Sequence, residues 1–112
     1  KAREDFMFVM AKEGTWINLP QLPGISFKTL AKNNKAGYVT FLLKMDAGAI
    51  LPSHHHSHAE ECYVIEGSIT TRGRQLGPGD FLHAEEGSDH EPIRAEKESM
   101  ALLVVAEADY DF

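Results

Sequence analysis

The residues best able to do chemistry in this chain are four histidines and two glutamates close together near its centre: His54, His55, His56, His58, Glu60 and Glu61. Neutral imidazole nitrogens and carboxylate oxygens are common ligands of divalent transition metals, so this cluster indicates a metal site. A solvated loop or part of a purification tag would have a similar composition. Tags lie at chain ends, whereas this cluster lies between two apolar runs, which disfavours a tag.

The spacing of these residues selects three of them if the first part of the run is extended. Successive side chains of a strand point to opposite faces, so His54 and His56 would share a face. Glu60 lies four residues further on, across a bend, and can return to that face. Two histidines and one carboxylate form the facial ligand set of non-haem iron sites. A register slip of two residues would replace His56 by His58.

A fourth ligand from a later strand would close such a pocket, and His90 is the candidate. It follows Gly87-Ser88-Asp89, just past the turn after an expected strand at residues 81–84.

The segments that would position these residues resemble short strands. Runs rich in β-branched and aromatic residues, or alternating in polarity, are separated by turn signals such as Pro23-Gly24 and Gly77-Pro78-Gly79-Asp80. The expected strands cover residues 16–19, 25–30, 38–45, 62–65, 68–72, 81–84, 93–95 and 99–107. Residues 1–12 are ambiguous between a strand and an arm, and 108–112 are expected to form a tail. With about eight or nine strands and no convincing amphipathic helix, the pattern predicts an all-β sandwich or barrel.

Length and composition limit the class of protein. The 112 residues, 43% hydrophobic and 25% charged, are expected to form one domain spanning 1–112. A formal net charge of −6 disfavours a nucleic-acid partner. The longest apolar run, residues 100–106, is far shorter than the roughly 20 residues of a membrane span. A single cysteine, Cys62, excludes an intrachain disulfide. The first residues lack a signal-peptide cleavage site, so we expect a cytoplasmic protein.

The histidine run resembles the first motif of the cupin family. That motif is Gly, five residues, His-x-His, three or four residues, Glu, six residues, Gly. Gly48, His54, His56, Glu60 and Gly67 match it at every spacing. Five fixed positions seldom coincide by chance, so this motif is highly specific.

A second cupin motif is matched less completely. It reads Gly, five residues, Pro-x-Gly, two residues, His, three residues, Asn. Gly79, Gly87 and His90 match, whereas Glu85 stands in place of the proline and Arg94 in place of the asparagine. These departures affect the turn and leave the ligand position intact. Together the two motifs and the segment between them cover about 47 residues.

The flanks are similar to the ChrR-type cupins, in which the fold occurs in zinc anti-sigma factors and in relatives that resemble acetylacetone dioxygenases. The resemblance rests on Trp16, Pro23-Gly24, the run Lys28-Thr29-Leu30 and the pair Glu60-Glu61. It implies a double-stranded β-helix, the cupin jelly-roll barrel, with one divalent metal per chain. The implied ligands are His54, His56, Glu60 and His90. It also implies a homodimer, for which the apolar arm at residues 1–14 would suit strand exchange.

Three functions are consistent with such a site. Fe, Mn, Co or Ni in octahedral coordination would keep two adjacent positions open for a bidentate oxygen substrate and dioxygen, which favours a dioxygenase-like oxidoreductase acting on a small carbonyl or diketone compound. Zn would be satisfied by four protein ligands, which favours a non-catalytic sensor or regulatory module. A metal-dependent isomerase or lyase is the third. Against a sensor, the chain contains no Cys-x-x-Cys pair.

The remaining chemically capable residues are expected to have other roles. His55 and His58 are expected on the surface, and Glu61 in solvent. Cys62 is expected to be a small buried hydrophobic residue, the alternative being a position near the metal, since it shares its strand parity with Glu60. His83 is expected to be exposed, the alternative being a hydrogen bond to a ligand carboxylate. Arg94 is expected to be a surface charge, the alternative being a contact with an anionic substrate.

Overall fold

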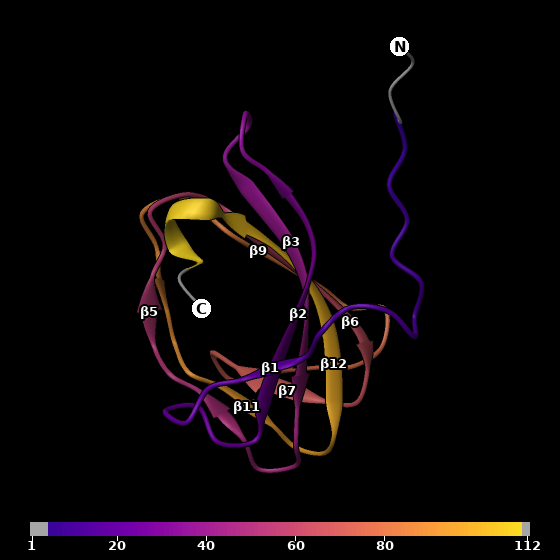
Figure 1. Cartoon of the computed structure of the whole chain (residues 1–112). Coiled ribbons are helices and arrows are strands. Elements are labelled where there is room, and N and C mark those ends of the chain that lie inside the picture. The colour runs from indigo at the N-terminus through magenta and orange to yellow at the C-terminus, as the bar shows by residue number, and fades with distance from the viewer. Residues whose placement is uncertain (1–4, 111–112) are drawn as a thin grey trace.

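Antiparallel sheets surround one apolar interior (Figure 1). The computed structural model describes residues 5–110, apart from the side chain of His90. Residues 1–4, which begin the expected arm, and residues 111–112 of the expected tail lie outside the described residues. No helix in this part of the chain has the length and hydrophobicity that a membrane span requires.

The largest sheet has six strands in the order β1-β2-β3-β12-β6-β9. In that order they are Ile17–Asn18, Ile25–Asn33, Tyr38–Met45, Ser99–Ala106, Glu60–Glu66 and Phe81–Ala84. The C-terminal strand β12 therefore lies between β3 and β6, and it pairs with both over most of its length. This arrangement places the strand that begins at Glu60 beside the most extensively paired part of the sheet.

Two smaller sheets complete the barrel. The four-stranded sheet has the order β4-β11-β7-β8, with strands Ile50–Leu51, Ile93–Ala95, Ile69–Thr71 and Arg74–Leu76. The two-stranded sheet pairs β5, His54–His55, with β10, Asp89–His90. A short 3-10 helix, η1 at Glu107–Asp109, follows β12. The architecture is all-β, as the sequence predicts, and it is that of a jelly-roll barrel.

Alternation of side chains along the strands builds the core. In β3 every second residue is buried, and the same holds for most of β12. Leu103 lies opposite both Phe41 and Cys62 in the paired register, so the three inner faces meet. Each fully buried side chain of this kind stabilises the fold by roughly 1.5–3 kcal/mol relative to an exposed one.

A sharp corner at Gly67 carries the chain from β6 into the four-stranded sheet. Its φ of +92° lies in the left-handed region, which favours glycine. An added Cβ would also lie only 2.5 Å from the Glu98 carbonyl oxygen. The buried Ser99 hydroxyl accepts a hydrogen bond from the Ser68 N–H at 2.9 Å and so closes the corner. The motif glycine at this position is therefore required by both backbone conformation and space.

The structure corrects two expectations of the sequence. It contains twelve strands between residues 5 and 110 rather than eight or nine, because two-residue bridges such as β5 and β10 have no pattern of their own to detect. The sequence predicts that the last strand ends at residue 107 and that a tail begins at residue 108, but residues 107–109 form η1. The Glu107 N–H donates to the Gly37 carbonyl at 2.8 Å, which turns the chain back over the barrel.

Candidate metal centre

Three of the predicted site residues come together in space. One ligand atom from each of His54, His56 and Glu60 lies within 4.8 Å of the others, and the group is the kind that can hold a metal ion. His54 is half-buried, whereas His56 is 0% exposed and Glu60 7% exposed. The cluster is thus largely withdrawn from solvent.

The local backbone explains why these three converge. His54 belongs to β5, and His56 follows after one intervening residue, so both rings point inward while His55 points outward. The chain then leaves strand geometry between residues 56 and 59 and re-enters it at β6. In β6 the buried positions alternate from Glu60, so its carboxylate points inward. We call residues 54–60 the ligand loop.

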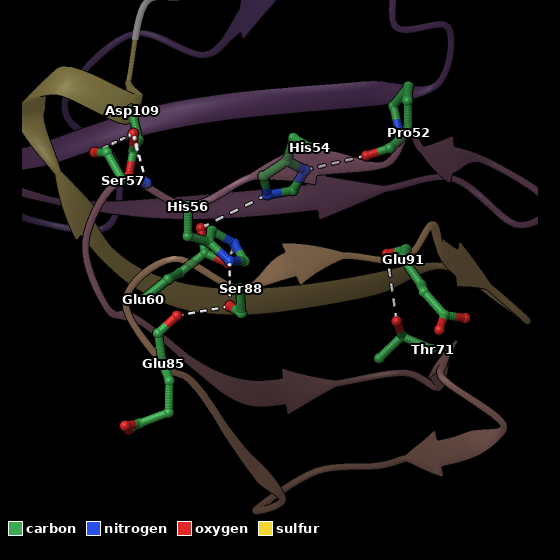
Figure 2. Close-up of polar contacts among 10 residues, drawn as sticks. All are labelled: Pro52, His54, His56, Ser57, Glu60, Thr71, Glu85, Ser88, Glu91 and Asp109. Carbon is green, nitrogen blue, oxygen red and sulfur yellow. Dashed lines mark hydrogen bonds and ion pairs between the residues drawn. The ribbon is translucent and has the colours of Figure 1, made fainter.

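Hydrogen bonds fix the orientation of both imidazoles (Figure 2). His54 Nδ1–H donates to the Pro52 carbonyl at 3.1 Å. The Ser88 hydroxyl donates its proton to the Glu85 carbonyl at 2.6 Å, so it accepts from His56 Nδ1–H at 3.1 Å. In each neutral ring Nε2 is left as the lone-pair nitrogen, and both Nε2 atoms face Glu60.

The distances between ligand atoms suit a metal ion. His56 Nε2 lies 3.0 Å from Glu60 Oε2, and His54 Nε2 lies 3.9 Å from Glu60 Oε1. Ligand atoms about 2.1 Å from a shared metal, at right angles, would be about 3.0 Å apart. A buried lone-pair nitrogen that faces a carboxylate is unfavourable unless a proton or a metal cation lies between them. The residues present therefore fit a divalent metal.

The predicted fourth ligand lies on the adjacent strand. His90 in β10 pairs directly with His54 in β5, so two segments 36 positions apart in sequence share one register. Its side chain is outside the part of the chain that the structure describes, so its role as a ligand stays a prediction. Directly opposed positions of an antiparallel pair share a face of the sheet.

Burial and charge shift two pKa values at the site. The hydrogen bond to Glu60 raises the pKa of His54 above its usual value, although burial opposes the shift. Burial raises the pKa of the Cys62 thiol to about 12, and the nearby Glu60 charge adds to this. Cys62 is 2% exposed, so the expectation of a small buried residue is consistent with the structure.

The other histidines lie on the surface, as predicted. His55 Nδ1 lies 2.7 Å from Asp89 Oδ1, and His58 Nδ1 lies 2.9 Å from Ser57 Oγ. His83 is exposed and bonds Glu61 and Glu85 at 3.2 and 2.8 Å.

Arg94 and Glu85 occupy the departures from the second motif. The Arg94 side chain is exposed and lies 3.8 Å from the Glu96 carboxylate, away from the cavity. The turn at Glu85 closes without proline, through a Ser88 N–H to Glu85 carbonyl bond of 3.1 Å and a positive φ at Gly87.

A cavity of about 280 Å³ opens onto the cluster from inside the barrel. Its polar lining residues are Ser53, His54, His55, Glu60 and Asp109. The remaining wall is mainly apolar and includes Phe27, Phe41, Leu43, Leu51, Leu103 and Val105. None of the lining residues in the described part of the chain is a lysine or an arginine.

Asp109 and Ser88 are functional candidates that the sequence does not reveal. Asp109 comes from η1, in the segment expected to be a tail, and carried no pattern that could mark it. Ser88 has only one weak sequence signal, its place two residues before His90. Both act through contacts that depend on distant segments.

Comparison with known proteins identifies the family and the fold. A sequence model of the family described as "ChrR Cupin-like domain" matches residues 4–108. Among curated protein sequences, none matches this chain.

Several solved structures share the fold at low sequence identity. An acetylacetone dioxygenase from Acinetobacter johnsonii is 17% identical, with 95% of this chain and 77% of that chain covered and a TM-score of 0.81. An RmlC-like cupin from Shewanella frigidimarina is 22% identical, with 98% and 96% covered and a TM-score of 0.79. A chain of the Rhodobacter sphaeroides SigE complex with the anti-sigma ChrR is 21% identical, with 86% of this chain and 51% of that chain covered and a TM-score of 0.74. At these identities the likeness establishes the fold alone.

Proposed function

Since the chain belongs to the ChrR cupin-like domain family, we propose that it is a metal-dependent, dioxygenase-like oxidoreductase acting on a small carbonyl or diketone compound. The observation that carries the proposal is the apolar cavity of about 280 Å³ that ends on His54 and Glu60. Ligand sites are usually concave, mostly apolar and provided with a few convergent polar groups. This volume is at the lower limit of such sites and suits a small ligand.

The proposed metal would be held by His54, His56 and Glu60, with His90 as the fourth ligand. Support for His90 comes from its backbone register opposite His54. A divalent metal in this position would act as a Lewis acid toward a bidentate oxygen ligand and, as iron, would pass electrons from the bound substrate, which is oxidised, to dioxygen. The protein residues supply orientation: Pro52 and Ser88 hold the two imidazoles with Nε2 toward Glu60.

The charges around the cavity favour a neutral substrate. Glu60 and Asp109 contribute carboxylates, and no lysine or arginine is among the described lining residues. Glu60 would bind the proposed metal, whereas the Asp109 carboxylate adds a negative charge to the cavity lining. A substrate carboxylate would therefore be disfavoured relative to a neutral carbonyl. The apolar wall formed by residues such as Phe41 and Leu43 excludes water around the bound substrate.

Oxygen uptake tests this proposal. Untagged protein depleted of metal and reloaded with Fe(II) is expected to consume dioxygen with a neutral 1,3-diketone, and much more slowly with a 2-oxo acid of similar size. The Glu60→Gln variant is expected to lose this activity, while His58→Ala, at an exposed residue outside the cavity lining, is expected to retain it. Tightly held zinc together with no oxygen uptake for any compound would contradict the oxidoreductase and favour a non-catalytic sensor.

We also propose that two copies of the chain associate through the N-terminal arm. Within the described part of the arm, five consecutive apolar residues, Phe6 to Met10, are between 38% and 76% exposed. The segment extends away from the barrel (Figure 1), and exposed apolar clusters of this kind mark interaction surfaces. Light scattering should give a dimer mass for the full chain and a monomer mass after deletion of residues 1–10. An unchanged mass after deletion would contradict an arm-mediated dimer.

A further inference from the structure

The carboxylate of Asp109, 52 residues after Ser57, accepts hydrogen bonds from the ligand loop (Figure 2). Its Oδ1 accepts a hydrogen bond from the Ser57 hydroxyl at 2.6 Å. The Ser57 N–H faces both carboxylate oxygens, at 3.3 Å to Oδ1 and 3.2 Å to Oδ2. Burial opposes the ionisation of Asp109, but the bonds from Ser57 and from the His58 N–H lower its pKa below the usual value. The Asp109 carboxylate is therefore ionised when it accepts these hydrogen bonds.

Ser57 lies between the two buried residues of the cluster, His56 and Glu60. Residues 56–59 belong to no strand, so the sheet ladder does not fix their position. On one side, the His56 N–H donates to the Ser88 carbonyl and the His56 carbonyl accepts from the Gly87 N–H, both at 2.9 Å. On the other side the loop is held by Asp109. Loss of that contact would leave the segment leading to Glu60 with fewer constraints.

Asp109 is itself anchored to the main sheet rather than to the loop. Its neighbour Tyr110 packs on the Phe41 ring with centroids 4.7 Å apart. The Tyr110 hydroxyl also hydrogen-bonds Thr29 Oγ1 at 2.6 Å, and the Glu107 N–H bonds the Gly37 carbonyl. The position of the ligand loop is thereby fixed relative to β2 and β3. Both strands line the cavity, through Phe27 and Phe41. Asp109 borders that same cavity.

We propose that Asp109 is a positioning residue for the metal centre: by holding Ser57 it fixes the spacing of His56 and Glu60 and slows the loss of the metal. This inference rests on the proposed metal site. Residues that orient metal ligands without touching the metal typically change affinity 10–100-fold when removed. Asp109 contacts Ser57 rather than a ligand side chain, so its effect on the metal passes through the loop backbone. We therefore expect its removal to change metal binding about tenfold, at the low end of that range.

Release of Co(II) to an excess of chelator, followed by the visible absorption of the bound ion, measures the effect. Asp109→Ala is expected to release Co(II) about tenfold faster than the unmodified protein. Asp109→Asn keeps one acceptor oxygen and is expected to fall between the two. Ser57→Ala loses the hydroxyl bond but keeps the N–H contacts, and should also be intermediate. Adding Ser57→Ala to Asp109→Ala should cause little further change, because the two residues share one interaction.

The matched control is Tyr110→Phe, which removes the bond to Thr29 but keeps the ring packed on Phe41 and the Glu107–Gly37 bond, so that Asp109 stays anchored. It is expected to change release less than twofold. Equal acceleration by Tyr110→Phe and Asp109→Ala would overturn the proposal, because the effect would then be general loosening of the segment. Unchanged release in Asp109→Ala would also overturn it.

A second readout separates this inference from the proposed metal site. Amide hydrogen exchange of the metal-free protein at residues 57–60 is expected to be faster in Asp109→Ala and unchanged in Tyr110→Phe. If the unmodified protein bound no Co(II) while this exchange difference appeared, the metal site would fail and the loop-positioning role would stand. Unchanged exchange in Asp109→Ala would contradict the positioning role whether or not metal is bound.

Discussion

Ser88 accepts a hydrogen bond from His56, and this contact decides which nitrogen of the most buried imidazole faces Glu60. The His56 Nδ1 to Ser88 Oγ distance is 3.1 Å, and Ser88 cannot donate in return because its proton is directed to the Glu85 carbonyl. The bond joins the ligand loop to the turn that precedes His90. It therefore links the two sequence motifs within a single contact.

Removal of this acceptor should weaken metal binding. In Ser88→Ala, the His56 Nδ1–H loses its partner while the ring stays buried, so its orientation is less well defined. We expect metal affinity to fall about 10–100-fold, measured by competition with a chelator of known affinity. Ser88→Thr retains a hydroxyl and serves as the control. Unchanged affinity in Ser88→Ala would show that packing alone orients His56.

The corner at Gly67 should be among the least replaceable positions of the barrel. Gly67→Ala combines a φ of +92° with a Cβ only 2.5 Å from the Glu98 carbonyl oxygen, so we expect it to lower the free energy of unfolding by about 2–5 kcal/mol. Gly37→Ala has a similar φ of +81° but meets nothing within 4 Å, and should cost only about 1–2 kcal/mol. Urea unfolding measures both. Equal losses of unfolding free energy in the two variants would mean that the close approach of the Glu98 carbonyl adds nothing to the cost at Gly67.

The sequence predicted the β architecture and three members of the cluster for clear physical reasons. The strands at 38–45, 81–84 and 93–95 were predicted with the bounds that the structure has, because each is an alternating or β-branched run ended by turn residues. His54, His56 and Glu60 converge because strand parity is a local property that spacing alone determines. The surface position of His55 follows from the same parity.

Contacts that depend on long-range pairing were not predictable. The sequence predicts a tail at Asp109, because no local pattern indicates that η1 folds back onto β3 and reaches Ser57. The two-residue strands β5 and β10 were missed for the same reason, because each exists only through its partner. The burial of Lys28 also depends on a distant segment. Its ammonium group donates a hydrogen bond of 3.2 Å to the Ala11 carbonyl, 17 residues earlier in the sequence.

His83 should titrate above the usual range for histidine. It lies between Glu85 and Glu61, and the hydrogen bonds to these carboxylates raise its pKa, with that to Glu85 contributing most. Because the folded-state pKa is raised, the stabilisation is fully present below the unfolded pKa and is lost as the pH rises through the folded value. NMR titration should therefore give a pKa above the ordinary value, and Glu85→Gln should lower it. A pKa at or below the ordinary value would contradict the contacts.

Cys62 should be unreactive in the folded protein. Burial raises its pKa to about 12, so the thiolate is scarce at neutral pH and the sulfur is also shielded. A thiol reagent is expected to label Cys62 only after unfolding in denaturant. Rapid stoichiometric labelling of the native protein at neutral pH would show that the strand pair β6 and β12 opens readily.

The central claim, a metal held by His54, His56, Glu60 and His90, is tested most directly by elemental analysis of untagged protein and single variants. The unmodified chain, His55→Ala and His58→Ala are predicted to carry one divalent metal ion per chain. His56→Ala and His90→Ala are predicted to lose it while remaining folded by circular dichroism. Full metal content in His90→Ala would remove His90 from the ligand set, and full content in His56→Ala would contradict the metal centre itself.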